Sequence, residues 1–223
     1  MSKPLFILIS GKRLSGKDTV ANILSELLKD KTIEITHLAD AIRKEVMDLY
    51  PHEITNIKQL ADNDDPIKKK YRPELIRIGQ ERRAVNVDHW CEVTLEDGLY
   101  SGKDVVIIPD IRFPNELKFF RKQEDIDTFA IRVSATPEAR AARGYEFTQG
   151  VDNDVSEVSL DIPYEKTKWD TVLVDAGMAP YLVGIDLANS RYATKEISMM
   201  GIAQAVERGV LPLMLQIGEQ TND

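Results

Sequence analysis

Residues 11–17 combine glycines, a serine and a lysine at the spacing of a phosphate-binding loop. Their sequence, Gly-Lys-Arg-Leu-Ser-Gly-Lys, fits the pattern G-x-x-x-x-G-K. The glycines let the backbone curl so that its N–H groups point at phosphate oxygens, and Lys17 can reach the β- and γ-phosphates of a nucleotide. We expect Lys17 and Arg13 to be catalytic. The predicted ATP site consists of Gly11, Lys12, Arg13, Ser15, Gly16, Lys17, Asp18 and Thr19.

Oxygen-bearing side chains near this loop are candidates for binding Mg²⁺. The pattern is usually followed by a serine or threonine whose hydroxyl binds the ion, but here Asp18 follows, and then Thr19. Asp110 ends a second apolar run, and a carboxylate at the end of a neighbouring strand holds Mg²⁺ or its waters in P-loop proteins. We predict that Asp18, Thr19 and Asp110 organise the ion, and which of them replaces the usual hydroxyl stays open.

Arginines are the other residue type that phosphoryl transfer needs, because a planar guanidinium binds phosphate oxygens in pairs. Arg112 lies two residues after Asp110, and Arg140 and Arg143 flank the start of an irregular polar segment. We expect Arg112 and Arg143 to be catalytic, and Arg140 and Arg143 to bind the donor phosphates. The residues expected to bind the acceptor are Arg72, Arg77, Arg82, Arg83 and Arg112.

Apolar runs that alternate with segments of helical spacing position these residues. Strands are predicted at 5–9, 33–35, 105–108, 129–133 and 171–174. Helices are predicted at 19–29, 40–50, 74–83, 87–99, 115–122 and 137–143, with a basic helix start at 68–72 and a candidate helix at 197–208. The alternation predicts an α/β fold with a parallel sheet, in which ligands bind beyond the carboxyl ends of the strands.

The same pattern predicts how the domain and its functional segments are arranged along the chain. We expect one P-loop kinase domain over residues 1–177, with the acceptor-side helices at 38–99. Residues 140–163 are polar and contain glycines, so they are expected to form a mobile lid that excludes water when it closes. Residues 178–223 are a C-terminal extension of unassigned role, expected to pack on the same domain.

Composition limits the partners. The 223 residues carry a formal net charge of -8, which argues against nucleic-acid polymers and anionic membranes. No apolar run is long enough for a transmembrane helix, and the single cysteine, Cys91, suits a reducing compartment. We therefore expect a cytoplasmic monomer or homodimer whose ligands are ATP and a small phosphorylated substrate.

The phosphate loop, with Asp18 after its lysine, resembles that of the animal-type phosphomevalonate kinases. Residues 71–83 are similar to the acceptor side of that family, and residues 143–161 resemble its lid. The likeness runs over residues 5–177. It implies a three-layer fold of the P-loop NTPase type, nucleoside-monophosphate-kinase-like, with ATP and Mg²⁺ as cofactors and phosphomevalonate as the acceptor. Leu14 departs from the resemblance, because loops of this type often carry a further basic residue there.

Two other hypotheses for the function compete with a phosphomevalonate kinase. Residues 110–116, Asp-Ile-Arg-Phe-Pro-Asn-Glu, look more like the phage-type deoxynucleoside monophosphate kinases, which share the scaffold. The acceptor is therefore open between phosphomevalonate and a (deoxy)nucleoside monophosphate, whose base could stack on Tyr71 and Trp90. A non-catalytic nucleotide-binding module is a third hypothesis, and the acceptor arginines count against it.

Overall fold

The predicted alternation of strands and helices is present in the computed structural model, which describes residues 3–161, 169–175, 181–186, 191–195, 206–212 and 214. Within these residues the strands are β1 (Leu5–Gly11), β2 (Ile33–Ile35), β3 (Val105–Ile111), β4 (Asp127–Ala135), β5 (Thr171–Asp175), β6 (Tyr181–Asp186) and β7 (Arg191–Lys195). The helices are α1 (Lys17–Leu27), α2 (Leu38–Leu49), α3 (Lys58–Ala61), α4 (Pro66–Val85), α5 (His89–Tyr100), α6 (Pro114–Arg121), α7 (Pro137–Ala141), α8 (Val155–Val158) and the π-helix η1 (Val206–Val210).

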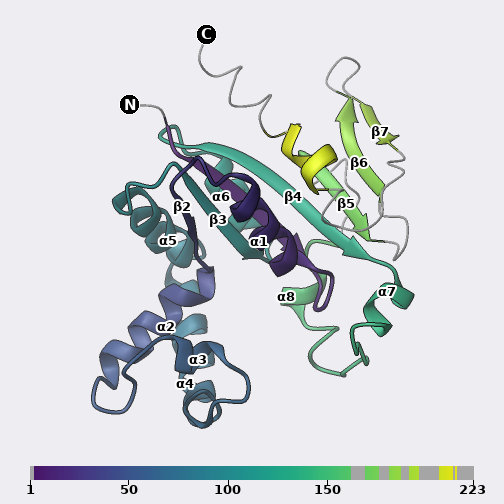
Figure 1. Ribbon diagram of the computed structural model, residues 1–223. Helices are drawn as coiled ribbons and strands as arrows, with labels where there is room; N and C mark the ends of the chain where they lie inside the picture. The colour runs from purple at the N-terminus through teal and green to yellow at the C-terminus, as the bar shows by residue number, and fades with distance from the viewer. Residues whose placement is uncertain are drawn as a thin grey trace. The chain divides into compact units, whose positions relative to one another are not determined.

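The strands form one sheet in the order β2-β3-β1-β4-β5-β6-β7 (Figure 1). Strands β1 to β5 pair in parallel, and β6 and β7 continue the sheet antiparallel. Because β1 lies between β3 and β4, Ser10 is aligned with Ile111, and Gly11 with Val133. The predicted α/β fold with a parallel sheet is confirmed, and the segments that follow these three strands meet at the edge where such sheets bind ligands.

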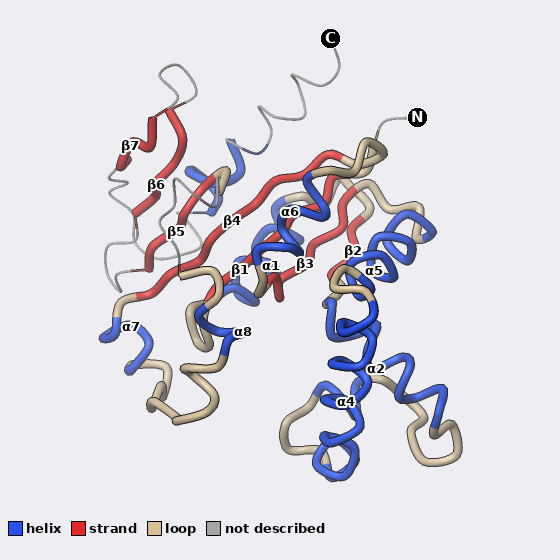
Figure 2. Tube along the Cα trace, turned by 180° about the vertical axis from the view of Figure 1, so that it is seen from behind, coloured by secondary structure: helices blue, strands red, loops and turns tan. Residues whose placement is uncertain are grey.

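Both faces of the central strands are covered, which explains why they read as continuous apolar runs. On one face Ile7 packs with Leu24 of α1 and with Val210 of η1. On the other face the ring of Phe6 lies 5.9 Å from that of Phe120 in α6. Figures 1 and 2, which view the molecule from opposite sides, show α1 and α6 over opposite faces. The sheet is therefore the middle of three layers, as the sequence predicted.

Strand β3 is longer than predicted, because it extends to Ile111 and the prediction ended at residue 108. Leu8 of β1 is opposite Ile108, but Ser10 is opposite Ile111, so β3 contains one extra residue here. This bulge accommodates Pro109, which has no N–H to give to the sheet. It also places Asp110 at the carboxyl end of β3, beside β1.

Residues Thr36–Gly102, which follow β2 and precede β3 in the sequence, form a compact unit of their own. Its helices, α2 to α5, share a core that includes Val46, Leu60, Tyr71 and Trp90. The indole N–H of Trp90 donates to the carbonyl of Gly79 at 3.2 Å, which satisfies its polar group inside this core. The predicted acceptor-side helices all lie in this unit.

Some helix boundaries differ from the predicted ones for identifiable reasons. Helix α1 begins at Lys17, because Gly16 adopts a left-handed conformation (φ 96°) that leads directly into the helix. The helix start at 68–72 continues through 74–83 as predicted, but α4 begins earlier, at Pro66, because Asp65 caps it by accepting from Ile67 N at 2.8 Å. The short helix α8 lies in the segment that showed no helical period, and Asp154 caps it.

The C-terminal residues that the structure describes contribute to the sheet and its core. Strand β6 pairs with β5, and Val206, Val210 and Met214 are buried in the same core as α1. Of the candidate helix at 197–208, residues 206–208 belong to η1, and the others lie outside the described residues. None of the helices described is long and apolar enough to cross a membrane.

Candidate active site

The segment between β1 and α1 is tightly curled, as a phosphate loop requires. Leu14 and Gly16 have positive φ angles of 60° and 96°, and Ser15 N donates to the carbonyl of Lys12 at 3.1 Å. A Cβ atom on Gly11 would lie 2.6 Å from the carbonyl oxygen of Val133 and would also collide with Ser15. Glycine is therefore needed at position 11 for close approach, and at position 16 for its backbone angle.

The curled loop and the start of α1 offer a set of donors that fits phosphate. The N–H groups at the N-terminus of α1 have no partners inside the helix and attract anions. The Lys17 side chain is only 15% exposed and its ammonium lies 3.1 Å from the Asp18 carboxylate. The buried hydroxyl of Ser15 has no hydrogen-bond partner among the described residues, so a bound phosphate oxygen would satisfy it.

The carboxyl end of β3 brings Arg112 to the same edge of the sheet. Two backbone N–H groups, those of Arg112 and Phe113, donate to the Glu116 carboxylate at 2.7 and 3.0 Å and so fix the turn from β3 into α6. The Arg112 guanidinium forms a hydrogen-bonded ion pair with Glu157 of α8. Arg112 is thus oriented from two sides.

The segment predicted as a lid contacts the backbone of the phosphate loop. It begins at Thr136, whose hydroxyl caps α7 by accepting from Ala139 N. Arg140 Nε donates to the carbonyl of Arg13 at 3.1 Å, and Arg143 Nη1 donates to that of Leu14, also at 3.1 Å. Both predicted lid arginines therefore lie beside the loop. In Figure 1, α8 likewise lies next to the turn between β1 and α1.

Arg13 is the residue that ties the loop to this segment most extensively. Its guanidinium donates to both carboxylate oxygens of Asp152, at 3.1 and 2.8 Å, and to the carbonyl of Glu146 at 2.7 Å. The hydrogen bond from Arg13 lowers the pKa of the buried Asp152 and outweighs the effect of burial, which raises it. The same hydrogen bond raises the pKa of Arg13. Arg13 is predicted to bind phosphates, but in this structure its side chain binds residues 146–152 of the segment predicted as a lid.

Acidic residues of the lid segment were missed as site residues. Asp152 pairs with Arg13, Glu157 with Arg112, and Asp161 with both Lys12 and Arg132. Arg132, buried in β4, also donates to Ser10 Oγ at 2.7 Å. These partners are far apart in the sequence, so no spacing motif connects them; the accumulation of acidic residues after Arg143 was the one available signal.

Four of the predicted acceptor arginines lie on α4 in the helical unit and most have protein partners there, whereas the fifth, Arg112, follows β3. Arg77 pairs with Glu74 and Glu81, each at 2.7 Å. Arg82 pairs with Glu45, and Arg83 donates to the carbonyl of Gly79 at 3.4 Å. Arg72 forms no hydrogen bond or ion pair within the part of the chain that the structure describes.

Arg72 belongs instead to a group of positive charges. Burial lowers the pKa of Lys68, and repulsion from Arg43 and Arg72 lowers it further. Arg43 is held by Asp40 on the same helix, at 2.5 Å, and its side chain is largely buried. Arg43, Lys68 and Arg72, here called the helical-unit cation cluster, therefore lie close enough together for Lys68 to be repelled by the other two. Asp40 balances the charge of Arg43, and Lys68 donates to the neutral oxygens of Ala61 and Asn63, so Lys68 and Arg72 keep the positive charge that an anion would neutralise. Arg43 and Lys68 were not predicted as site residues.

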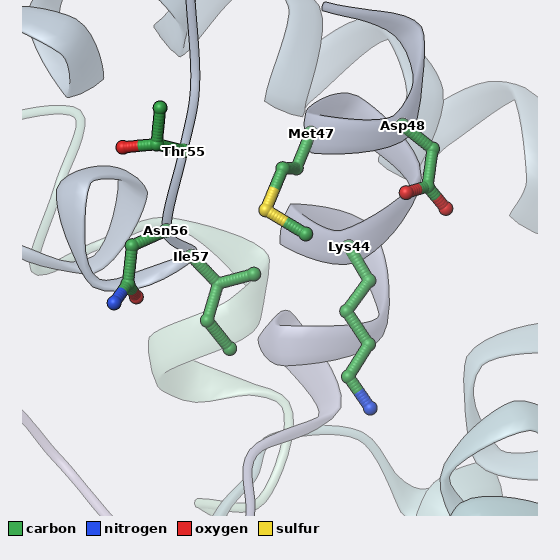
Figure 3. A pocket seen from close by; sticks show the side chains of 6 residues that line it. All are labelled: Lys44, Met47, Asp48, Thr55, Asn56 and Ile57. Atoms are coloured by element: carbon green, nitrogen blue, oxygen red, sulfur yellow. The ribbon is translucent and has the colours of Figure 1, made fainter. Parts of the chain in front are cut away.

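Two other features of the helical unit bear on what it binds. Tyr71 and Trp90 are 5% and 3% exposed, so neither offers a face for stacking a nucleobase. A pocket is lined by Lys44, Met47, Asp48, Thr55, Asn56 and Ile57, and Figure 3 shows Met47 and Ile57 facing one another across it. The charge of Lys44 is matched by Asp97 at 2.6 Å, so this pocket has no cation available for a phosphate.

The metal candidates lie at the expected edge of the sheet. Asp18 and Thr19 are exposed at the start of α1, and Asp110 is half-buried at the end of β3. In the described part of the chain, no three His, Cys, Asp or Glu side chains gather as a ready-made metal site. Two carboxylates and one hydroxyl at this edge fit Mg²⁺, which keeps several waters and binds through one or two carboxylates together with substrate phosphates.

The chain is similar in sequence to known proteins. The family model described as phosphomevalonate kinase matches residues 9–126, which include the phosphate loop and the helical unit. The phosphomevalonate kinase of Drosophila melanogaster is 31% identical over 157 residues, which are 70% of this chain and 80% of that protein.

Solved structures show only a distant likeness. The structure of TT1252 from Thermus thermophilus has a TM-score of 0.40 and 21% identity, and the match covers 79% of this chain and 91% of that one. A structure from the PezAT toxin–antitoxin system of Streptococcus pneumoniae has a TM-score of 0.45 and 14% identity over 99% of this chain and 86% of that one. The family match and the Drosophila relative carry the assignment: the chain belongs to the phosphomevalonate kinase family and is a phosphotransferase whose acceptor bears a phosphate group.

Proposed function

We propose that this protein transfers the γ-phosphoryl group of ATP to the phosphate of phosphomevalonate. The observation that carries the proposal is the phosphate loop, with its glycine-dependent curl and its unpartnered Ser15 hydroxyl, in a chain of the phosphomevalonate kinase family. An oxygen of the acceptor phosphate attacks the γ-phosphorus, the bond from that phosphorus to the β–γ bridging oxygen breaks, and ADP leaves. No general base is needed, because the attacking oxygen is already an anion.

The donor phosphates are assigned to the loop and the residues beside it. The N–H groups of α1, the Ser15 hydroxyl and Lys17 would bind them, and Lys17 would neutralise the charge that develops on the leaving oxygen. Arg140 and Arg143 lie close enough to the loop to complete this site. Asp18, Thr19 and Asp110 would hold Mg²⁺, which when bound neutralises phosphate charge.

The acceptor phosphate is assigned to the helical-unit cation cluster. Arg72 supplies a guanidinium without a hydrogen-bond or ion-pair partner in the described chain, and Lys68 supplies a second positive charge, whereas the charge of Arg43 is balanced by Asp40. The carboxylates around Arg77 and Arg82 already balance those charges, so these two arginines rank below Arg72. The burial of Tyr71 and Trp90 removes the aromatic slot that a nucleoside monophosphate would have used, which favours phosphomevalonate.

A turnover screen tests the acceptor. The full chain is mixed with ATP and Mg²⁺, and ADP release is measured with phosphomevalonate, mevalonate and each common nucleoside and deoxynucleoside monophosphate. We expect phosphomevalonate to give the highest kcat/KM, by about a hundredfold or more, because a polar acceptor site discriminates strongly between phosphate esters. Preferred turnover of a nucleoside monophosphate would replace the acceptor assignment while keeping the kinase assignment. No ADP release with any acceptor would contradict both.

A further inference from the structure

Glu157 makes contacts that differ from those of the other lid carboxylates. One of its carboxylate oxygens accepts from the backbone N–H of Arg13, in the phosphate loop, at 3.0 Å. The other oxygen accepts from the Arg112 guanidinium. The side chain is only 9% exposed. Its place is fixed by the capping of α8, where Asp154 accepts from Ser156 N at 2.8 Å.

The two donors that meet at Glu157 are the kinds of group that bind phosphoryl oxygens. Loop N–H groups form the anion-binding concavity of phosphate loops, and guanidinium groups bind phosphate through charge-assisted hydrogen bonds. A carboxylate resembles part of a phosphoryl group, because it offers two negatively charged oxygens to such donors. By contrast, Asp152 and Asp161 contact the loop through the side chains of Arg13 and Lys12.

We propose that Glu157 is a placeholder for a phosphoryl group: it positions Arg112 and the Arg13 N–H before a polyphosphate binds, and the polyphosphate displaces its carboxylate. The inference rests on the proposed function, because it assumes that these donors meet phosphoryl oxygens during the reaction. Like charges repel at short distance, so a phosphoryl group and an ionised Glu157 cannot share the two donors. Every polyphosphate that binds must therefore break the bonds of Glu157 first, which lowers its affinity.

The sign of one change in affinity separates a placeholder from a structural brace. If Glu157 only braced the loop, removing its charge would loosen the site and weaken phosphate binding. If it is a placeholder, the same change removes a competitor and strengthens binding. Glu157→Gln keeps the shape of the side chain, and Glu157→Ala removes the carboxylate while suiting helix α8.

The experiment is a calorimetric titration of the full chain with ADP and, separately, with inorganic tripolyphosphate. We expect Glu157→Gln and Glu157→Ala to bind both probes about threefold to tenfold more tightly than the wild type, and the KM for ATP to fall by a similar factor. Glu138→Gln, which makes the same charge change at an exposed position of α7, is the matched control and should leave both affinities within about twofold of the wild-type values.

Unchanged or weaker binding in folded Glu157 variants would overturn the inference, and so would the failure of both variants to fold, since Glu157 would then be a brace. These failures are distinct from failure of the proposed function. If the wild type binds ADP and phosphorylates phosphomevalonate but the variants bind no more tightly, only the role of Glu157 is wrong. If the wild type binds neither probe, the phosphate site itself is wrong.

Discussion

At the scale of single residues, the partners of an arginine decide whether its charge is available to a substrate. From the sequence, all four arginines of α4 are predicted to bind the acceptor, with no reason to rank one above another: Arg72, Arg77, Arg82 and Arg83. In the structure, carboxylates neutralise Arg77 and Arg82, whereas Arg72 lies in the helical-unit cation cluster. A guanidinium that is already in ion pairs must give them up before it can bind phosphate, so its net gain is small.

This difference predicts unequal effects of two matched substitutions on one helix. Arg72→Ala should raise the KM for phosphomevalonate by about tenfold to a hundredfold, since a charge-assisted hydrogen bond to phosphate is lost. Arg77→Ala, which removes the same side chain from the exposed face of α4, should change it by less than about threefold. Steady-state kinetics at saturating ATP give both values. A larger effect at Arg77 than at Arg72 would move the acceptor site along the helix.

Single residues could be predicted only where a motif existed, and their roles remain predictions. Gly11, Gly16 and Lys17 could be named because the chemistry of a phosphate loop fixes their spacing. The partners of that loop could not, because Asp152 and Glu157 lie 139 and 144 residues from Arg13 in the sequence. An ion pair of that kind depends on the tertiary fold, and single-sequence patterns record only local periodicity.

At the scale of elements, the start of α2 shows how the cation cluster is held. Asp40 accepts from the backbone N–H of His37 at 3.0 Å and from Arg43 at 2.5 Å. Partial burial raises the pKa of Asp40, but the hydrogen bonds from His37 and Arg43 outweigh it and lower the pKa from 3.8 to about 2. Asp40 thus caps the helix and orients Arg43 at the same time.

The lowered pKa of Asp40 predicts an acid-labile contribution to stability. Because the pKa is lower in the folded state, the contribution is complete above the unfolded value of 3.8 and is lost as the pH falls toward about 2. Asp40→Asn should lower the free energy of unfolding by about 1–2 kcal/mol at neutral pH, after allowance for solvent screening of this half-buried group, and by less near pH ~3. Urea denaturation at both pH values measures this.

Asp48→Asn is the matched control for that experiment, because Asp48 is exposed near the C-terminus of the same helix. A negative charge there opposes the helix dipole, so its removal should leave stability unchanged or slightly higher. Equal losses in the two variants, or a loss in Asp40→Asn that does not diminish at acidic pH, would contradict the role of Asp40.

The lid segment was expected to be mobile because it has few apolar groups. Its contacts are indeed polar: Arg140 and Arg143 bind loop carbonyls, and Asp152 binds Arg13. Polar anchors of this kind are weakened by water and salt, so mobility remains a prediction despite the closed arrangement. The sequence could give the place of this segment but not its anchors, since these lie on β1 and the loop that follows.

Arg143→Ala tests whether this segment serves the donor. We expect kcat to fall by about tenfold to a hundredfold, because Arg143 lies beside the loop, while the affinity for phosphomevalonate without ATP stays nearly unchanged. Single-turnover kinetics and acceptor titration measure the two quantities, with Lys118→Ala on exposed α6 surface as a control. Loss of acceptor binding in the absence of ATP would place Arg143 in the acceptor site instead.

At the scale of the whole molecule, the central strands of the sheet could be predicted from the sequence. The apolar runs at β1, β3, β4 and β5 are strands, because burial on both faces leaves an unmistakable apolar pattern. The compactness of Thr36–Gly102, which contains the predicted acceptor-side helices at 38–99, leaves no signal of its own in the sequence, since its core forms from helices with ordinary amphipathic spacing and no linker marks its ends. The antiparallel addition of β6 and β7 was also not predicted.

The most direct test of the account is phosphorus NMR of the full chain with ATP, Mg²⁺ and phosphomevalonate. We predict that the phosphomonoester signal of the acceptor gives way to the paired signals of a diphosphate, in step with the conversion of ATP to ADP. Lys17→Ala should slow this conversion by several orders of magnitude while keeping its fold, and Lys29→Ala, on exposed surface just past α1, should not. ATP consumed without a diphosphate product, or normal conversion by folded Lys17→Ala, would contradict phosphoryl transfer at this loop.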